Sequence, residues 1–141
     1  MRARQSPGVR DWREETATDL RHSLKTVEEL LPTISGELSD QQVRSVWYAY
    51  LFVEKSIAFI RVEIDEENPG KFVNTKLYSV PDERQALVFT LRKLTSGSEE
   101  FALGDFRRAL TELRGARNYL RMLLRGKRKL KRGSARNLRT G

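Results

Sequence analysis

Seven arginines in the last third of the chain share one side of a predicted helix, and arginine is a residue that can bind phosphate or carboxylate. At about 100° per residue, all seven fall within an arc of roughly 80°. The guanidinium group stays charged near neutral pH and presents a planar fork of donors to an anion. The spacing therefore predicts a docking strip for a polyanion. The seven residues are Arg107, Arg114, Arg117, Arg121, Arg125, Arg128 and Arg132.

The positive charge of the chain is concentrated around this row. The formal net charge is +8. Residues 104–141 hold 13 Lys and Arg against Asp105 and Glu112, whereas residues 1–103 hold 14 basic and 17 acidic residues. Such an uneven distribution favours a nucleic acid or another anionic surface as the partner. The alternative is that the basic end folds back on the acidic body of its own chain.

The predicted phosphate contacts combine the row with the lysines that follow it. Phosphate contacts provide affinity and a strong salt dependence, but they do not read base sequence. The chain has no aromatic RNP motif and no strong helix-turn-helix signature, so DNA versus RNA and sequence specificity stay open. The predicted nucleic-acid-binding residues are Arg107, Arg114, Arg117, Arg121, Arg125, Lys127, Arg128, Lys129, Lys131 and Arg132.

Catalytic chemistry has little support in the sequence. His22 is the only histidine, there is no cysteine, and no nucleophile motif surrounds the histidine. The signature of the helical HEPN ribonucleases places an arginine shortly before a histidine, whereas positions 15–17 of this chain hold Glu, Thr and Ala. No phosphate loop, dinucleotide fingerprint or metal-ligand spacing occurs. We therefore expect a protein without enzymatic activity, cofactor or metal ion.

Composition favours a cytoplasmic protein. Without cysteine the chain can form no disulfide, which fits a reducing compartment. Charged residues interrupt every apolar stretch well before the 18 residues that a membrane span needs. The basic residues Arg2 and Arg4 are not followed by the apolar core of a signal peptide.

The length of 141 residues fits one domain with a tail at each end. Residues 1–10 have no apolar period and are expected to be a flexible basic arm. Residues 11–125 are expected to form an all-α domain, a bundle of about four main helices. Residues 126–141 contain no acid and several glycines, which predicts a disordered basic tail. If the last helix ends at Gly126, only the first five arginines remain aligned.

Capping and breaking residues divide the domain into four helices. Asp11 with Glu14 and Ser39 with Gln42 match the capping-box pattern, and Pro32 ends the first helix. The expected bounds are near 11–31, 40–66, 81–95 and 105–125.

Two stretches are less regular than these helices. Residues 71–80 are rich in apolar side chains without a helical or strand period, so they could form an extended segment over the bundle or a short strand. Ser96-Gly97-Ser98 is expected to break or bend the third helix, followed by a short helical turn over 99–103.

The second helix is the predicted core of the domain. Its apolar residues alternate three and four apart without a break, which gives a heptad-like seam and predicts a central helix contacted by several neighbours. Trp47, Phe52 and Phe59 add apolar surface outside this seam, which indicates a homodimer or a protein partner. The residues of the seam are Val43, Val46, Tyr50, Val53, Ile57, Ile60 and Ile64.

These observations predict a non-enzymatic accessory protein that binds DNA or RNA through an arginine-rich helix and tail. The alternative is a helical protein–protein interaction subunit of a larger assembly with an acidic partner. Attachment to a membrane surface through Leu120 and residues 122–124 is disfavoured, because Ala109, Leu113 and Ala116 on the same helix are needed for the core.

Overall fold

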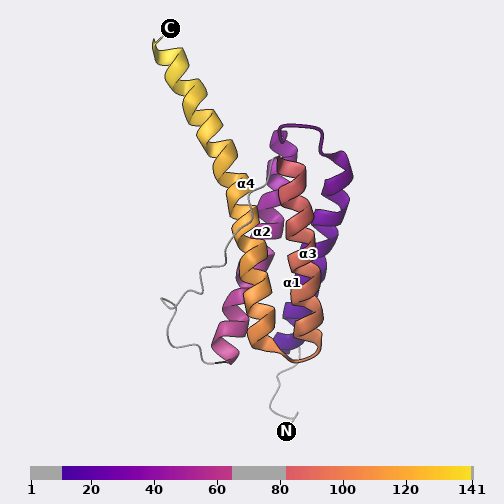
Figure 1. Cartoon of the computed structure of the whole chain (residues 1–141). Helices are drawn as coiled ribbons and strands as arrows, with labels where there is room; N and C mark the ends of the chain where they lie inside the picture. Colours follow the sequence, from indigo (N-terminus) through magenta and orange to yellow (C-terminus); the bar gives the residue numbers. More distant parts are fainter. Residues whose placement is uncertain (1–10, 65–81, 141) are drawn as a thin grey trace.

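The computed structural model describes residues 11–64 and 82–140, with side chains described as far as Arg125. All regular elements in this part of the chain are helical, so the predicted all-α fold is confirmed (Figure 1). A single 3-10 turn, η2 (Leu31–Thr33), follows the first helix. The four α-helices are α1 (Trp12–Leu30), α2 (Asp40–Glu63), α3 (Glu83–Ala102) and α4 (Phe106–Thr140).

The four helices pack as a bundle in which each helix runs alongside two others. Helix α1 packs against α2 and α3, and α4 packs against the same two helices. The α1–α4 and α2–α3 pairs are therefore the diagonals of the bundle. Figure 1 shows that α1 and α4 run in one direction and that α2 and α3 run in the other.

Local capping explains where the helices begin. The Ser39 Oγ accepts from the Gln42 N–H at 3.2 Å, and the Gln42 side chain accepts from the Ser39 N–H at 2.8 Å, which confirms the predicted capping box. Asp11, Asp82 and Asp105 each accept a hydrogen bond from an N–H in the first turn of the helix that follows. These carboxylates also lie at the positive end of the helix dipole.

Two helix bounds differ from the sequence-based expectation. Helix α3 runs without a break through Gly97, so the expected break or bend at residues 96–98 was wrong. Helix α4 begins at Phe106 as expected, and its bounds extend to Thr140 rather than ending near residue 125. The expectations for residues 1–10 and 71–80 lie outside the described residues.

Gly97 allows a close approach of α3 to α4. A Cβ atom added at Gly97 would lie 2.9 Å from Cδ2 and 3.1 Å from Cγ of Leu113, which is fully buried. The glycine is needed because a side chain would collide with the neighbouring helix, and not because the helix ends there. The chain turns between α3 and α4 at Gly104, whose φ of 84° is in the left-handed region.

We expect substitutions at two buried glycines to have opposite effects on stability. Gly97→Val should lower the free energy of unfolding by about 1–3 kcal/mol, because it overpacks the contact with Leu113. Gly115→Ala should raise it by up to about 1 kcal/mol through helix propensity, because the atoms nearest to the new methyl group belong to the flexible side chain of Lys93. Urea unfolding of both variants measures the difference, and effects of the same sign would contradict this packing.

Helix α2 contributes to the core on one side only. Val46, Val53, Ile57 and Ile60 are buried, whereas Tyr50 is half-buried. The expected central position of α2 differs from the structure, because among the described helices α2 packs against α1 and α4 and its opposite side is exposed. Helix α4 contributes at least as much to the core, through Ala109, Leu110, Leu113, Ala116, Tyr119, Leu120 and Leu123.

Candidate nucleic-acid interface

The arginine row on α4 is divided into exposed and partly buried residues. Arg107 and Arg125 are exposed, whereas Arg114, Arg117 and Arg121 are partly buried. Within the described side chains the row is therefore not one uninterrupted strip open to a ligand.

Two of the partly buried arginines, Arg117 and Arg121, contact α2. Arg117 Nη1 lies 3.5 Å from Glu54 Oε1, and the Arg117 side chain is only 13% exposed. Arg121 Nη2 donates to the Tyr50 hydroxyl at 3.5 Å, and that hydroxyl donates to Glu54 Oε2 at 3.1 Å. These contacts form a polar network that connects α4 to α2.

Helix geometry explains why Arg117 is buried while Arg107 and Arg125 are exposed. At 100° per residue, Arg117 is rotated by about 80° from the other two, toward the apolar face of α4. A long arginine side chain in that position lays its apolar stem along the core and keeps its charged head at the edge. Glu54 then compensates the charge of that head.

The basic residues after Arg125 belong to the part of α4 that extends past the bundle. Figure 1 shows this C-terminal part of the helix standing clear of α1, α2 and α3. The sequence of residues 126–140 contains seven Lys and Arg and no Asp or Glu. Lys127, Arg128, Lys129, Lys131 and Arg132 are predicted site residues on this extension, and their side chains lie outside the described part of the structure.

The sequence pattern did not identify the residues of α2 that contact the middle of the arginine row. Tyr50 and Glu54 are four residues apart on α2 and meet Arg121 and Arg117 in reverse order, because α2 and α4 are antiparallel. Their spacing places them on one edge of α2, but only the tertiary packing shows that this edge faces the arginines.

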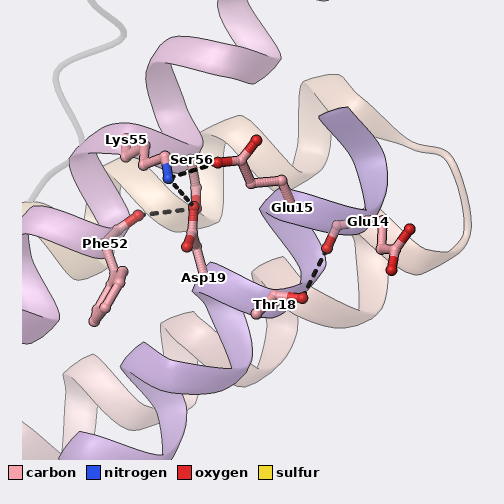
Figure 2. A network of polar contacts seen from close by, with 7 residues as sticks. All are labelled: Glu14, Glu15, Thr18, Asp19, Phe52, Lys55 and Ser56. Carbon is pink, nitrogen blue, oxygen red and sulfur yellow. Dashed lines mark hydrogen bonds and ion pairs between the residues drawn. The ribbon is translucent and has the colours of Figure 1, made fainter. Parts of the chain in front are cut away.

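A second charged cluster joins α1 to α2 (Figure 2). Lys55 Nζ lies 2.9 Å from Glu15 Oε1 and 3.3 Å from Asp19 Oδ2. The hydrogen bonds from Lys55 to Glu15, and then to Asp19, raise the pKa of the lysine above its ordinary value. Because Asp19 is buried, the lysine compensates a carboxylate that would otherwise be costly to bury.

The remaining polar groups of the described residues do not assemble a metal centre. His22 is exposed and stacks on the ring of Phe52 at 5.4 Å, beside a 520 Å³ cavity between α1 and α2. No group of three or more His, Cys, Asp or Glu side chains in residues 11–64 and 82–125 could hold a metal ion.

The fold defines the chain as an all-α four-helix bundle with one extended helix. No protein-family model matches the chain, and no curated protein or solved structure is significantly similar to it. None of the helices in the described part of the chain is both long enough and apolar enough to cross a membrane.

Proposed function

We propose that this protein binds nucleic acid through the C-terminal part of α4 and does not catalyse a reaction. The observation that carries the proposal is the position of the basic sequence 126–140, on a helix that extends past the end of the bundle. A helix of 15 residues is about 22 Å long, which is long enough to lie along several phosphates of a nucleic-acid strand. The cysteine-free composition fits a cytoplasmic location for this activity.

The division of the arginine row supports different roles for its members. Arg114 is partly buried, whereas Arg117 and Arg121 contact α2, so these two contribute to the direction in which α4 leaves the bundle. Arg125 is exposed at the start of the extension of α4, and the residues that follow it, 126–140, include no Asp or Glu. We therefore assign phosphate contact to Arg125, Lys127, Arg128, Lys129, Lys131 and Arg132.

The proposed contacts predict affinity without base specificity. Lysine and arginine that neutralise phosphates release condensed counterions, which makes binding strong at low salt and weak at high salt. Base specificity would need side chains that reach the base edges in a groove. We therefore expect similar affinities for duplexes of the same length and different sequence.

A charge-matched pair of variants tests where nucleic acid binds. Changing Lys127, Arg128 and Lys129 to Ala should weaken binding to a fluorescent DNA duplex by at least about tenfold at low salt. Changing Arg21, Lys25 and Arg84 to Ala removes the same number of charges from exposed positions on α1 and α3 and should change affinity by less than about threefold. Fluorescence anisotropy with duplex DNA, single-stranded DNA and structured RNA gives the three affinities for each variant.

Two outcomes would overturn the proposal. Equal weakening by both triple variants would show a general effect of net charge and not a site on α4. An intact chain that binds none of the three nucleic acids at low salt would point instead to an acidic protein as the partner of the same helix, which a pull-down with the intact chain would then test.

A further inference from the structure

One side of α2 carries large apolar side chains that no other part of the described chain covers. Trp47, Tyr48, Leu51 and Val62 keep between 40% and 80% of their surface exposed, and Ala58 is also exposed. At 100° per residue, these five residues lie within an arc of about 100°, opposite the buried face of the helix. We call them the outer face of α2. Isolated exposed apolar side chains are ordinary, but several large ones on the same side of one helix are typical of an interaction site.

We propose that the outer face of α2 pairs with the same face of a second copy of this chain, in antiparallel orientation. This pairing involves only residues of α2 and the helices beside it, so it does not depend on nucleic-acid binding. It also replaces the sequence-based choice of Phe52 and Phe59 as interface residues, because both are half-buried in the structure.

The order of side-chain sizes along the outer face favours a second copy in antiparallel orientation. The large side chains Trp47, Tyr48 and Leu51 come first, and the smaller Ala58 and Val62 follow. A two-fold axis between positions 54 and 55 sets Trp47 of one copy opposite Val62 of the other, and Leu51 opposite Ala58. Large side chains then fill the space beside small ones, which is the arrangement that close packing requires. A parallel pair would set Trp47 against Trp47 and leave a gap between two copies of Ala58.

The charges on and beside the outer face fit the same arrangement. Lys55 lies next to the axis, and its ammonium group is bound by Glu15 and Asp19 of α1. Figure 2 shows the Lys55 side chain turned toward these carboxylates, so two copies do not bring uncompensated lysines together. Arg44 is exposed near the start of α2 and Glu63 is exposed at its end. An antiparallel pair therefore brings Arg44 of one copy, together with the exposed Asp40 one turn before it, to the end of the interface that carries Glu63 of the other copy.

The dimensions of the face predict a reversible dimer. Helix α2 has 24 residues and is therefore about 36 Å long. One helix face of this length is at or below the size of a standard interface, which buries about 800 Å² per partner. We expect a dissociation constant in the micromolar range, on the order of 10 µM.

Sedimentation velocity on the full chain, without nucleic acid, tests whether the outer face forms a dimer. The average mass should rise toward that of a dimer between about 1 and about 300 µM. Leu51→Asp should raise the dissociation constant at least about tenfold. Leu103→Asp is the matched control, because Leu103 is a highly exposed leucine between α3 and α4, outside the outer face. Circular dichroism checks that both variants remain helical.

A second experiment tests the antiparallel orientation. The chain contains no cysteine, so single cysteines can be introduced without removing any native residue of that type. An oxidised mixture of Leu51→Cys and Ala58→Cys chains should form the mixed disulfide-linked dimer, because the two positions face each other across the axis. Each variant alone should give little disulfide-linked dimer, because disulfide formation requires Cα atoms less than about 7 Å apart.

Either experiment can overturn the proposal. A monomer mass at every protein concentration would mean that the outer face is covered by another segment of the same chain or by a different protein. Equal weakening by Leu51→Asp and Leu103→Asp would place the dimer interface elsewhere. Efficient cross-linking of each cysteine variant with itself would show a parallel pair. None of these results would alter the nucleic-acid affinity of the monomer, so failure of this proposal is distinguishable from failure of the proposed function.

Discussion

Replacing Ile57 with Ala is expected to lower the free energy of unfolding by about 2–5 kcal/mol. Ile57 is 3% exposed and belongs to the buried face of α2. Its removal leaves a cavity that the surrounding helices cannot fill completely, so the loss of buried apolar surface and the cavity both contribute. Urea unfolding monitored by circular dichroism, at protein concentrations below about 1 µM, measures this effect in the monomer.

Val62→Ala is the matched control for Ile57→Ala, because both residues lie on α2 and each loses a β-branched side chain. Val62 is 80% exposed, so its truncation should change the free energy of unfolding by no more than about 0.5 kcal/mol. A cost below about 1 kcal/mol for Ile57→Ala, or equal costs for both variants, would contradict the orientation of α2 in the bundle.

Arg117→Glu is expected to destabilise the bundle by about 2–4 kcal/mol, whereas Arg107→Glu should have an effect near zero. Arg117 is 13% exposed and lies 3.5 Å from Glu54, so the substitution places two carboxylates together at the edge of the core. Arg107 carries the same charge on the same helix but is exposed. Thermal or urea unfolding of the two variants measures the difference.

A charge exchange provides the control for Arg117→Glu. Combining it with Glu54→Arg restores opposite charges between α2 and α4 and should recover part of the lost stability. If the double variant recovers no stability, the loss in Arg117→Glu comes from the changed shape of the side chain at position 117 and not from its charge. Equal effects of Arg107→Glu and Arg117→Glu would contradict the division of the arginine row.

Short-range signals in the sequence were sufficient for much of the fold. The start of α2 follows from Ser39 and Gln42, because a capping box requires only residues within one turn. The alternating apolar positions on the second and fourth helices identified buried residues such as Val53, Ile57 and Leu113 correctly.

Packing between distant segments explains what the sequence did not predict. Gly97 was interpreted as a helix breaker, although its absent side chain instead makes room for Leu113 of α4. Likewise, the apolar residues of α2 predicted a central helix contacted by several neighbours, whereas α1 and α4 cover one side of α2 and the described residues leave the other side exposed. Both features depend on which helix lies opposite, and local periodicity carries no such information.

The sequence predicted which residues make up the arginine row, but only partly which of these arginines are exposed. The spacing of arginines on α4 follows from the sequence alone, and the bounds of α4 keep residues 106–140 on one helix. The contacts of Arg117 and Arg121 with Glu54 and Tyr50 depend on the antiparallel packing of α4 against α2. The sequence pattern therefore overestimated how many described arginines are open to a ligand.

The salt dependence of binding is the most direct test of the proposal that the extension of α4 binds phosphates. The association constant for a DNA duplex should be measured at several salt concentrations, for the intact chain and for a chain that lacks residues 127–141. We expect a slope of log K against log salt concentration of about −3 to −6 for the intact chain and a slope flatter than about −2 for the truncated chain. Equal slopes for the two chains, with equal affinity at low salt, would contradict the account.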